Sequence, residues 1–264
     1  MAQDDIPNFG PKTCPLSARC ADVFRETDHA LVAVSLFNGY YNKPRLRTLI
    51  DWAHSRFSQF HVPIFDAPHA YTLSAVGIPS SKAVGRARQE GRKLQRRVEK
   101  MLTDLPSGGG SAAMLTWDDM SRNPRYLELA IDTERAFHSD RRFRDACIAM
   151  TDQVNQARSL ADLPESESDH QACKDVPSIK AIDSALSVRY LLSEIPLFID
   201  TAGIVGSRSS IFCYHRSYEF YERFFSHEFA VGPNQNQAFL VVTFDDEDDC
   251  AENSDPQAQF LPAA

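Results

Sequence analysis

Several short motifs that define common enzyme classes are missing from this 264-residue sequence. No G-x-G-x-x-G follows a predicted strand and no G-x-x-x-x-G-K-[ST] occurs; the nearest approach, residues 85–93, has the wrong spacing and lies in a predicted helix. The H-E-x-x-H metal motif and the G-x-S-x-G nucleophile elbow are also absent. The sequence therefore disfavours dinucleotide-binding, P-loop, zincin and esterase-type chemistry.

Long apolar runs and paired cysteines are missing as well. No stretch approaches the ~20 consecutive apolar residues that a membrane span needs, and residues 1–5 lack the basic and apolar character of a signal peptide. The six cysteines are scattered, and no two of them form a C-x-x-C pair. We therefore expect a cytoplasmic protein with free thiols, no metal site, no cofactor and no membrane association.

Basic residues are concentrated in one segment of a chain whose formal net charge is -8. Residues 82–100 hold two acids, Glu90 and Glu99, against eight basic residues: Lys82, Arg86, Arg88, Arg92, Lys93, Arg96, Arg97 and Lys100. On a helix the eight fall on two adjacent stripes, which form a broad basic band. Such a band fits the phosphates of an A-form RNA stem, and a solvated helix face is the alternative.

Alternating strand and helix patterns predict the fold. Residues 1–27 are expected to be an irregular segment, residues 28–244 a single domain, and residues 245–264 an acidic, disordered tail. Strands are predicted at residues 30–34, 59–66, 112–117, 210–214 and 239–244, and helices at 44–57, 80–105, 126–138, 141–159, 178–199 and 218–225, with a long loop at 161–177. This order predicts a Rossmann-like, doubly wound, mostly parallel sheet flanked by helices.

The first predicted strand ends in a serine. Alternation along the strand places His29, Leu31, Ala33 and Ser35 on one face, and ligands of such sheets bind just beyond the strand ends. Taken alone, Ser35 could equally be a helix cap or a turn residue.

Two further segments contain residues suited to proton transfer. Tyr190 and Glu194 lie one helical turn apart on the same face, and Pro196 bends the helix just beyond them. A tyrosine beside a carboxylate can hold an amine and move its proton, although a surface pair is the simpler interpretation. Tyr214 and His215 end another predicted strand, where Tyr214 could also be an ordinary core residue.

Taken together, these segments resemble the cyclodipeptide synthase family. The residues HALVAVS at 29–35 match H-x-[LVI]-[LVI]-G-[LVI]-S except that Ala33 replaces glycine, and YLLSEIP at 190–196 matches Y-[LVI]-x-x-E-x-P. Asn38, Tyr214 and His215 are similar to the asparagine, tyrosine, histidine subgroup. The resemblance spans about residues 28–244, and it implies the fold of class I tyrosyl- and tryptophanyl-tRNA synthetase catalytic domains.

The resemblance implies an enzyme that converts two aminoacyl-tRNAs into a cyclic dipeptide, a 2,5-diketopiperazine, in ping-pong order. Ser35 would become an aminoacyl-enzyme, Tyr190 and Glu194 would bind the α-amino group, and Tyr214 would transfer protons. The basic helix would hold the tRNA. Downstream tailoring enzymes are partners that the resemblance suggests, and monomer and homodimer both stay open.

Four other residues receive supporting roles from the same resemblance. Asn38 and His215 would be positioning residues around the loop after the first strand. Leu31 and Ala33 would line the first side-chain pocket, where the extra methyl group of Ala33 would narrow it.

Three alternatives stay open. A non-catalytic RNA-binding module could have kept the basic helix, and a small-molecule serine hydrolase is disfavoured by the missing elbow. An aminoacylating enzyme is disfavoured because HIGH-type and KMSKS-type sequences are absent.

Overall fold

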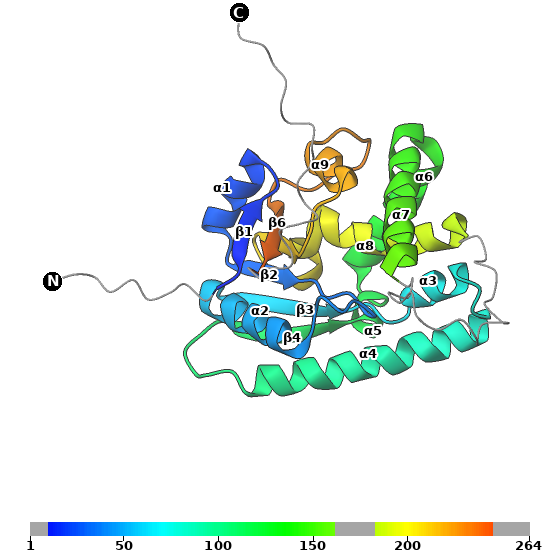
Figure 1. Cartoon of the computed structure of the whole chain (residues 1–264). Coiled ribbons are helices and arrows are strands. Elements are labelled where there is room, and N and C mark those ends of the chain that lie inside the picture. Colours follow the sequence, from blue (N-terminus) through cyan, green and yellow to red (C-terminus); the bar gives the residue numbers. More distant parts are fainter. Residues whose placement is uncertain (1–9, 162–182, 245–264) are drawn as a thin grey trace, which may run out of the picture.

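The computed structural model of the protein describes residues 10–161 and 183–244. Its six strands are β1 (Lys12–Pro15), β2 (His29–Val32), β3 (Gln59–Ile64), β4 (Ser111–Thr116), β5 (Ser210–Tyr214) and β6 (Gln237–Thr243). They form one sheet in the order β1-β6-β5-β2-β3-β4 (Figure 1). All neighbouring pairs are parallel except β1 with β6, so the doubly wound, mostly parallel fold is confirmed.

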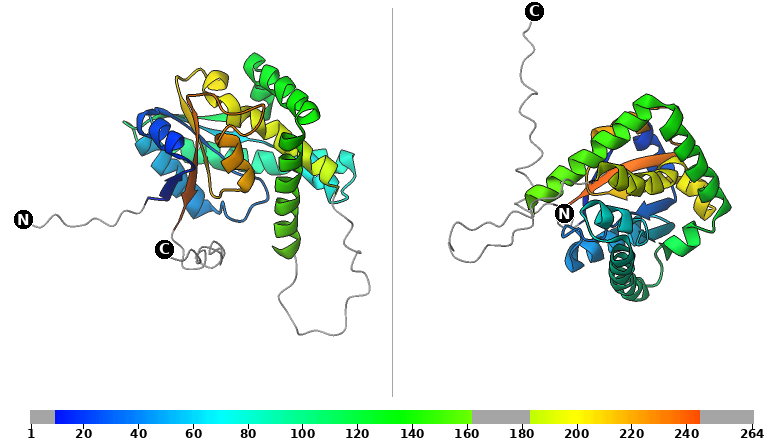
Figure 2. Two further views of the ribbon diagram at one scale, coloured as in Figure 1. Left: turned by 90° about the horizontal axis from the view of Figure 1, so that it is seen from above. Right: turned by 90° about the vertical axis from the view of Figure 1, so that its right-hand side faces the viewer.

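Helices follow and flank these strands. They are α1 (Ala18–Glu26), α2 (Lys43–Arg56), α3 (His69–Ala75), α4 (Ser80–Thr103), α5 (Trp117–Met120), α6 (Pro124–Ser139), α7 (Arg141–Ala161), α8 (Ser184–Val205) and α9 (Glu219–Phe225). Asn42 and Asn123 cap α2 and α6, each with a proline in the first turn. Figure 2 shows α6 and α7 beside α8, far from α1. Of the helices in the described residues, none has the length and apolar character of a bilayer span.

The N-terminal segment departs from the sequence-based expectation. Residues 1–27 were expected to be irregular, but β1 and α1 lie within them, and the Ser17 side chain caps α1 by accepting from the Cys20 N–H. A four-residue strand is too short to show a period, and β1 exists because it pairs with β6. The short helices α3 and α5 were not predicted either. Residues 162–177 of the predicted loop, residues 178–182 of the next helix and the tail at 245–264 lie outside the described residues.

The strand order fixes where a ligand can bind. β3 and β4 lie on one side of β2, whereas β5 and β6 lie on the other. The direction of winding therefore reverses between β2 and β5, and open α/β sheets bind ligands in the crevice outside the carboxyl ends of such strands. Ser35 follows β2 and Tyr214 ends β5, so both lie at this point.

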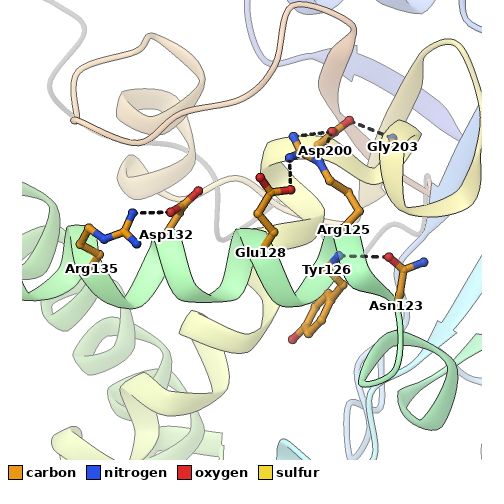
Figure 3. Close-up of polar contacts among 8 residues, drawn as sticks. All are labelled: Asn123, Arg125, Tyr126, Glu128, Asp132, Arg135, Asp200 and Gly203. Carbon is orange, nitrogen blue, oxygen red and sulfur yellow. Dashed lines mark hydrogen bonds and ion pairs between the residues drawn. The ribbon is translucent and has the colours of Figure 1, made fainter.

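Helix α8 is interrupted at Asp200, whose φ of -157° and ψ of 63° are not helical. Its carboxylate caps the last turn of the helix, because Oδ1 accepts the Gly203 N–H at 2.9 Å. The other oxygen, Oδ2, accepts from two nitrogens of Arg125 on α6, each at 2.8 Å (Figure 3). A Cβ on Gly203 would lie 2.4 Å from Oδ2, so the turn needs glycine there. This ion pair, in which Asp200 is buried and Arg125 is partly exposed, fixes the end of α8 against α6.

We expect Arg125→Ala to lower the free energy of unfolding by about 2 kcal/mol, because it leaves the buried Asp200 carboxylate without its cation. Urea unfolding measures the change. Arg135→Ala is the matched control on the same helix: its pair with Asp132 is exposed, with side chains 70% and 46% accessible, and should cost about 0.5 kcal/mol or less. An equal loss of unfolding free energy in the two variants would contradict a stabilising role for the Arg125–Asp200 pair.

A second buried polar group, His29, lies at the opposite edge of the sheet from Ser35, at the start of β2. Its Nδ1 lies 2.7 Å from the Ser210 Oγ and its Nε2 lies 2.9 Å from Nδ1 of His61. Burial, with a smaller contribution from His61, lowers the pKa of His29 to about 3. The histidine of the HALVAVS segment therefore supports the sheet.

We expect acid to destabilise the protein through His29. Its imidazole binds a proton near pH 6.5 when unfolded but only near pH 3 when folded, so stability falls as the pH decreases through this window. The contribution is at most about 1.4 kcal/mol per pH unit. Urea unfolding between pH 7 and pH 4 should show a flatter curve for His29→Gln than for the wild type. His138→Gln, at an exposed position on α6, gives the background effect of losing one histidine; curves for His29→Gln that run parallel to the wild type would refute the prediction.

Candidate active site

The ends of β2 and β5 bring a serine and a tyrosine together. Beyond the end of β2 the chain stays beside β5, because the Ala33 N–H donates to the Cys213 carbonyl at 3.0 Å. The Ser35 Oγ then lies 2.9 Å from the Tyr214 hydroxyl. Burial raises the pKa of Tyr214 well above its ordinary value, so the phenol keeps its proton at neutral pH and can donate it in a hydrogen bond.

Helix α8 supplies a second pair. The Tyr190 hydroxyl donates to the Glu194 Oε1 at 2.9 Å, one helical turn away. The Tyr190 ring packs edge-on against the buried His69 ring, with centroids 4.6 Å apart, and against Phe65 at 6.2 Å. These contacts hold the Tyr190 phenol next to its carboxylate partner.

Both pairs face one cavity. Besides Ser35, Tyr190, Glu194 and Tyr214, its lining includes apolar Met150, Val154 and Leu191 and polar Thr72, Asn155 and Ser187. Among the described residues that line the cavity, Glu194 is the one with a charged side chain. An ammonium group on a small, partly apolar molecule would complement this lining.

The predicted positioning residues, Asn38 and His215, form hydrogen bonds with the segment that follows Ser35. The Asn38 side chain accepts from the Tyr40 N–H at 3.0 Å and so stabilises the turn after Ser35. His215 is buried, and its Nδ1 lies 3.0 Å from the hydroxyl of Tyr41 in the same segment. Neither Asn38 nor His215 is among the described residues that line the cavity.

His215 is held as a neutral imidazole in one tautomer. The Arg216 Nε donates to its Nε2 at 2.9 Å, and a guanidinium cannot accept, so Nε2 carries no proton and Nδ1–H donates to the Tyr41 hydroxyl. Burial, Arg216 and Arg45 lower the pKa of His215 to about 3. The ring therefore anchors the turn after Ser35 to the end of β5 without changing charge near neutral pH.

Leu31 and Ala33, which the sequence analysis expects at the first side-chain pocket, are buried next to the segment that carries Ser35. Leu31 is fully buried in the core, Ala33 is nearly so, and neither is among the described residues that line the cavity. β2 ends at Val32, three residues before Ser35, so alternation along the strand does not by itself set the direction of the serine side chain. Cavity residues that the sequence analysis missed include Tyr218 and Tyr221, whose i, i+3 spacing after the Tyr-His pair was an available signal.

The basic band lies on the exposed side of α4. All eight of its lysines and arginines are exposed, whereas Ala83, Ala87, Leu94 and Val98 are buried on the opposite side. Within the band, Lys93 forms an ion pair with Glu90. Helix α3, which carries Thr72 of the cavity, packs against α4 (Figure 1). Helix α3 therefore contributes to the cavity and also packs against α4, the helix that carries the basic band.

Comparison with known proteins gives consistent results. The family model described as cyclodipeptide synthase matches residues 12–244. A cyclo(L-leucyl-L-leucyl) synthase from Bacillus subtilis is 29% identical over 229 residues, which cover 86% of this chain and 87% of that protein.

Solved structures share the fold. The structure of a Mycobacterium tuberculosis protein, used to relate cyclodipeptide synthetases to type I tRNA synthetases, has a TM-score of 0.74 at 24% identity and covers 90% of this chain and 94% of its own. A cyclodipeptide synthase from Candidatus Glomeribacter gigasporarum, solved bound to Phe-tRNAPhe, has a TM-score of 0.53 at 13% identity, with 89% and 91% covered. Because the family model covers most of the sequence, this chain belongs to the cyclodipeptide synthase family of tRNA-dependent aminoacyltransferases.

Proposed function

We propose that this chain condenses the amino acids of two aminoacyl-tRNAs into a cyclic dipeptide, in ping-pong order, through an aminoacyl ester on Ser35. The observation that carries the proposal is the meeting of two hydrogen-bonded pairs, Ser35 with Tyr214 and Tyr190 with Glu194, at one cavity. A nucleophile and an amine-binding carboxylate are the two functions that this reaction needs. Aminoacyl-tRNA is a cytoplasmic substrate, which agrees with the expected location.

The first step transfers an aminoacyl group to the enzyme. The Ser35 Oγ attacks the ester carbonyl, a new ester bond forms, and the bond to the ribose oxygen of the tRNA breaks. The serine proton passes to that departing oxygen. The substrate ester is already activated, so the step needs no ATP. The protonated Tyr214, 2.9 Å from the Ser35 Oγ, can donate a hydrogen bond to oxygen atoms that gain charge here.

The second step uses the other pair. Glu194 and the Tyr190 hydroxyl bind the α-ammonium of the tethered amino acid, and Glu194 accepts a proton from it. The freed amine attacks the second aminoacyl-tRNA ester, which releases the second tRNA and leaves a dipeptide on Ser35. The new terminal amine then attacks the Ser35 ester and closes the ring. Tyr214 mediates transfer of the proton that returns Ser35 to its hydroxyl form.

The basic band on α4 provides the RNA contact in this proposal. Its side chains are exposed and cationic, and phosphate neutralisation by such residues supplies affinity without reading sequence. Asn38 and His215 do not contact the reacting atoms in this proposal. They act as positioning residues, because their hydrogen bonds hold the turn that follows Ser35.

Substitution of Ser35 by alanine tests the covalent step. We expect Ser35→Ala to give no cyclic dipeptide in the medium of an expressing bacterium and no adduct in intact-protein mass spectrometry after mixing with aminoacyl-tRNA, because the acceptor oxygen is gone. Ser187→Ala, which removes another serine hydroxyl from the same cavity, should still form the adduct. An adduct on Ser35→Ala, or product from it, excludes Ser35 as the nucleophile.

Charge reversal on α4 tests the RNA contact. Arg96→Glu with Arg97→Glu should weaken tRNA binding and reduce the slope of log affinity against log salt by about 2, one for each lost phosphate contact. Filter binding at several salt concentrations measures the slope. Arg141→Glu with Arg142→Glu is the matched control, because it makes the same charge change at exposed positions of α7. An unchanged slope in the α4 variant would show that Arg96 and Arg97 do not contact RNA phosphates, and the band would then be a solvated helix face.

A further inference from the structure

Phe37 has an exposed side chain and an unfavourable backbone conformation. It lies in the turn after Ser35 with a φ of 60°, a region that favours glycine or asparagine and is rare for bulky side chains. The turn buries its neighbour Leu36 and leaves 47% of Phe37 exposed. Non-glycine residues held in this region cluster at active sites and ligand clamps.

The surroundings of Phe37 indicate what it could bind. It follows Ser35 by two residues, so the two Cα atoms lie within about 7 Å of each other. Arg86 of the basic band lies over its ring, with the guanidinium carbon 5.7 Å from the centroid. Phe37 is not among the described residues that line the amino-acid cavity. It therefore lies between the reactive hydroxyl and the basic helix.

We propose that Phe37 is the stacking platform for the terminal adenine of the aminoacyl-tRNA, an inference that rests on the proposed function. The adenine and the reacting ester belong to the same nucleotide, so an ester delivered to Ser35 brings that base next to the serine. Aromatic rings bind single-stranded bases by stacking, and arginine adds a cation–π contribution. Because all tRNAs end in the same three nucleotides, one fixed platform serves whichever amino acid is attached.

A fluorescent acceptor stem tests the platform directly. The probe is an RNA minihelix with an unpaired 3′ end in which 2-aminopurine replaces the last adenine, and a dye at the 5′ end reports binding by anisotropy. Stacking on Phe37 should quench the 2-aminopurine on binding to the wild type. Phe37→Leu should abolish the quenching and lower the affinity about 5- to 100-fold, with an unchanged salt slope because no phosphate contact is lost. Phe37→Trp should retain both signals.

Two variants separate stacking from folding and from general exposure. Phe37→Asn places a residue that tolerates this φ, so it should unfold at the same or a higher temperature and still lose the quenching. Tyr71→Leu removes the exposed aromatic ring of α3 and should change neither signal.

The outcomes distinguish this inference from the proposed function. Quenching that persists in Phe37→Leu, or an equal loss in Tyr71→Leu, overturns the platform. A wild-type protein that makes cyclic dipeptide but does not quench the bound probe also overturns the platform, while the proposed function stands. A wild-type protein that makes no product and binds no aminoacyl-tRNA overturns both.

Discussion

The parallel pairing of β2 with β5 is the constraint on which the site depends. These strands are adjacent in the sheet although about 180 residues separate them. Their shared register brings Ser35, three residues beyond the end of β2, and Tyr214, the last residue of β5, to the same edge of the sheet, and the two side chains form a hydrogen bond. The segment in between contributes lining residues from α3, α7 and α8, and Tyr218 and Tyr221, which follow β5, complete the described lining.

The cavity and the surface of α4 carry charges of opposite sign. Burial keeps Tyr214 protonated at the cavity wall, and Glu194 is the one acidic or basic side chain among the described residues that line the cavity. Outside, α4 presents its cations to solvent. The carboxylate of Glu194 therefore attracts a small ammonium group to the cavity, and the cations of α4 attract a large polyanion to the nearby surface. This separation suits a substrate that combines both kinds of group in one molecule.

Much of this arrangement could be predicted from the sequence, and the exceptions have physical causes. Strand and helix periods located the parallel core because those elements are long and strongly patterned. β1 was missed because its existence depends on pairing with a strand at the far end of the chain. Ser35, Tyr190, Glu194 and Tyr214 stood out through their local motifs. Thr72 and Asn155 did not, because they reach the cavity by tertiary packing alone, and no local spacing signals that.

The pairing of β1 with β6 has a consequence for synthesis. Lys12 lies opposite Thr243, so β1, which is made before the other described strands, cannot form its hydrogen bonds until β6, the last of them, has been made. A contact of such sequence separation is slow to close, and the edge of β6 stays open until it does. The sheet therefore cannot be completed while the end of β6 is still inside the ribosome, and the nascent chain passes through a state in which that strand edge is accessible to other chains.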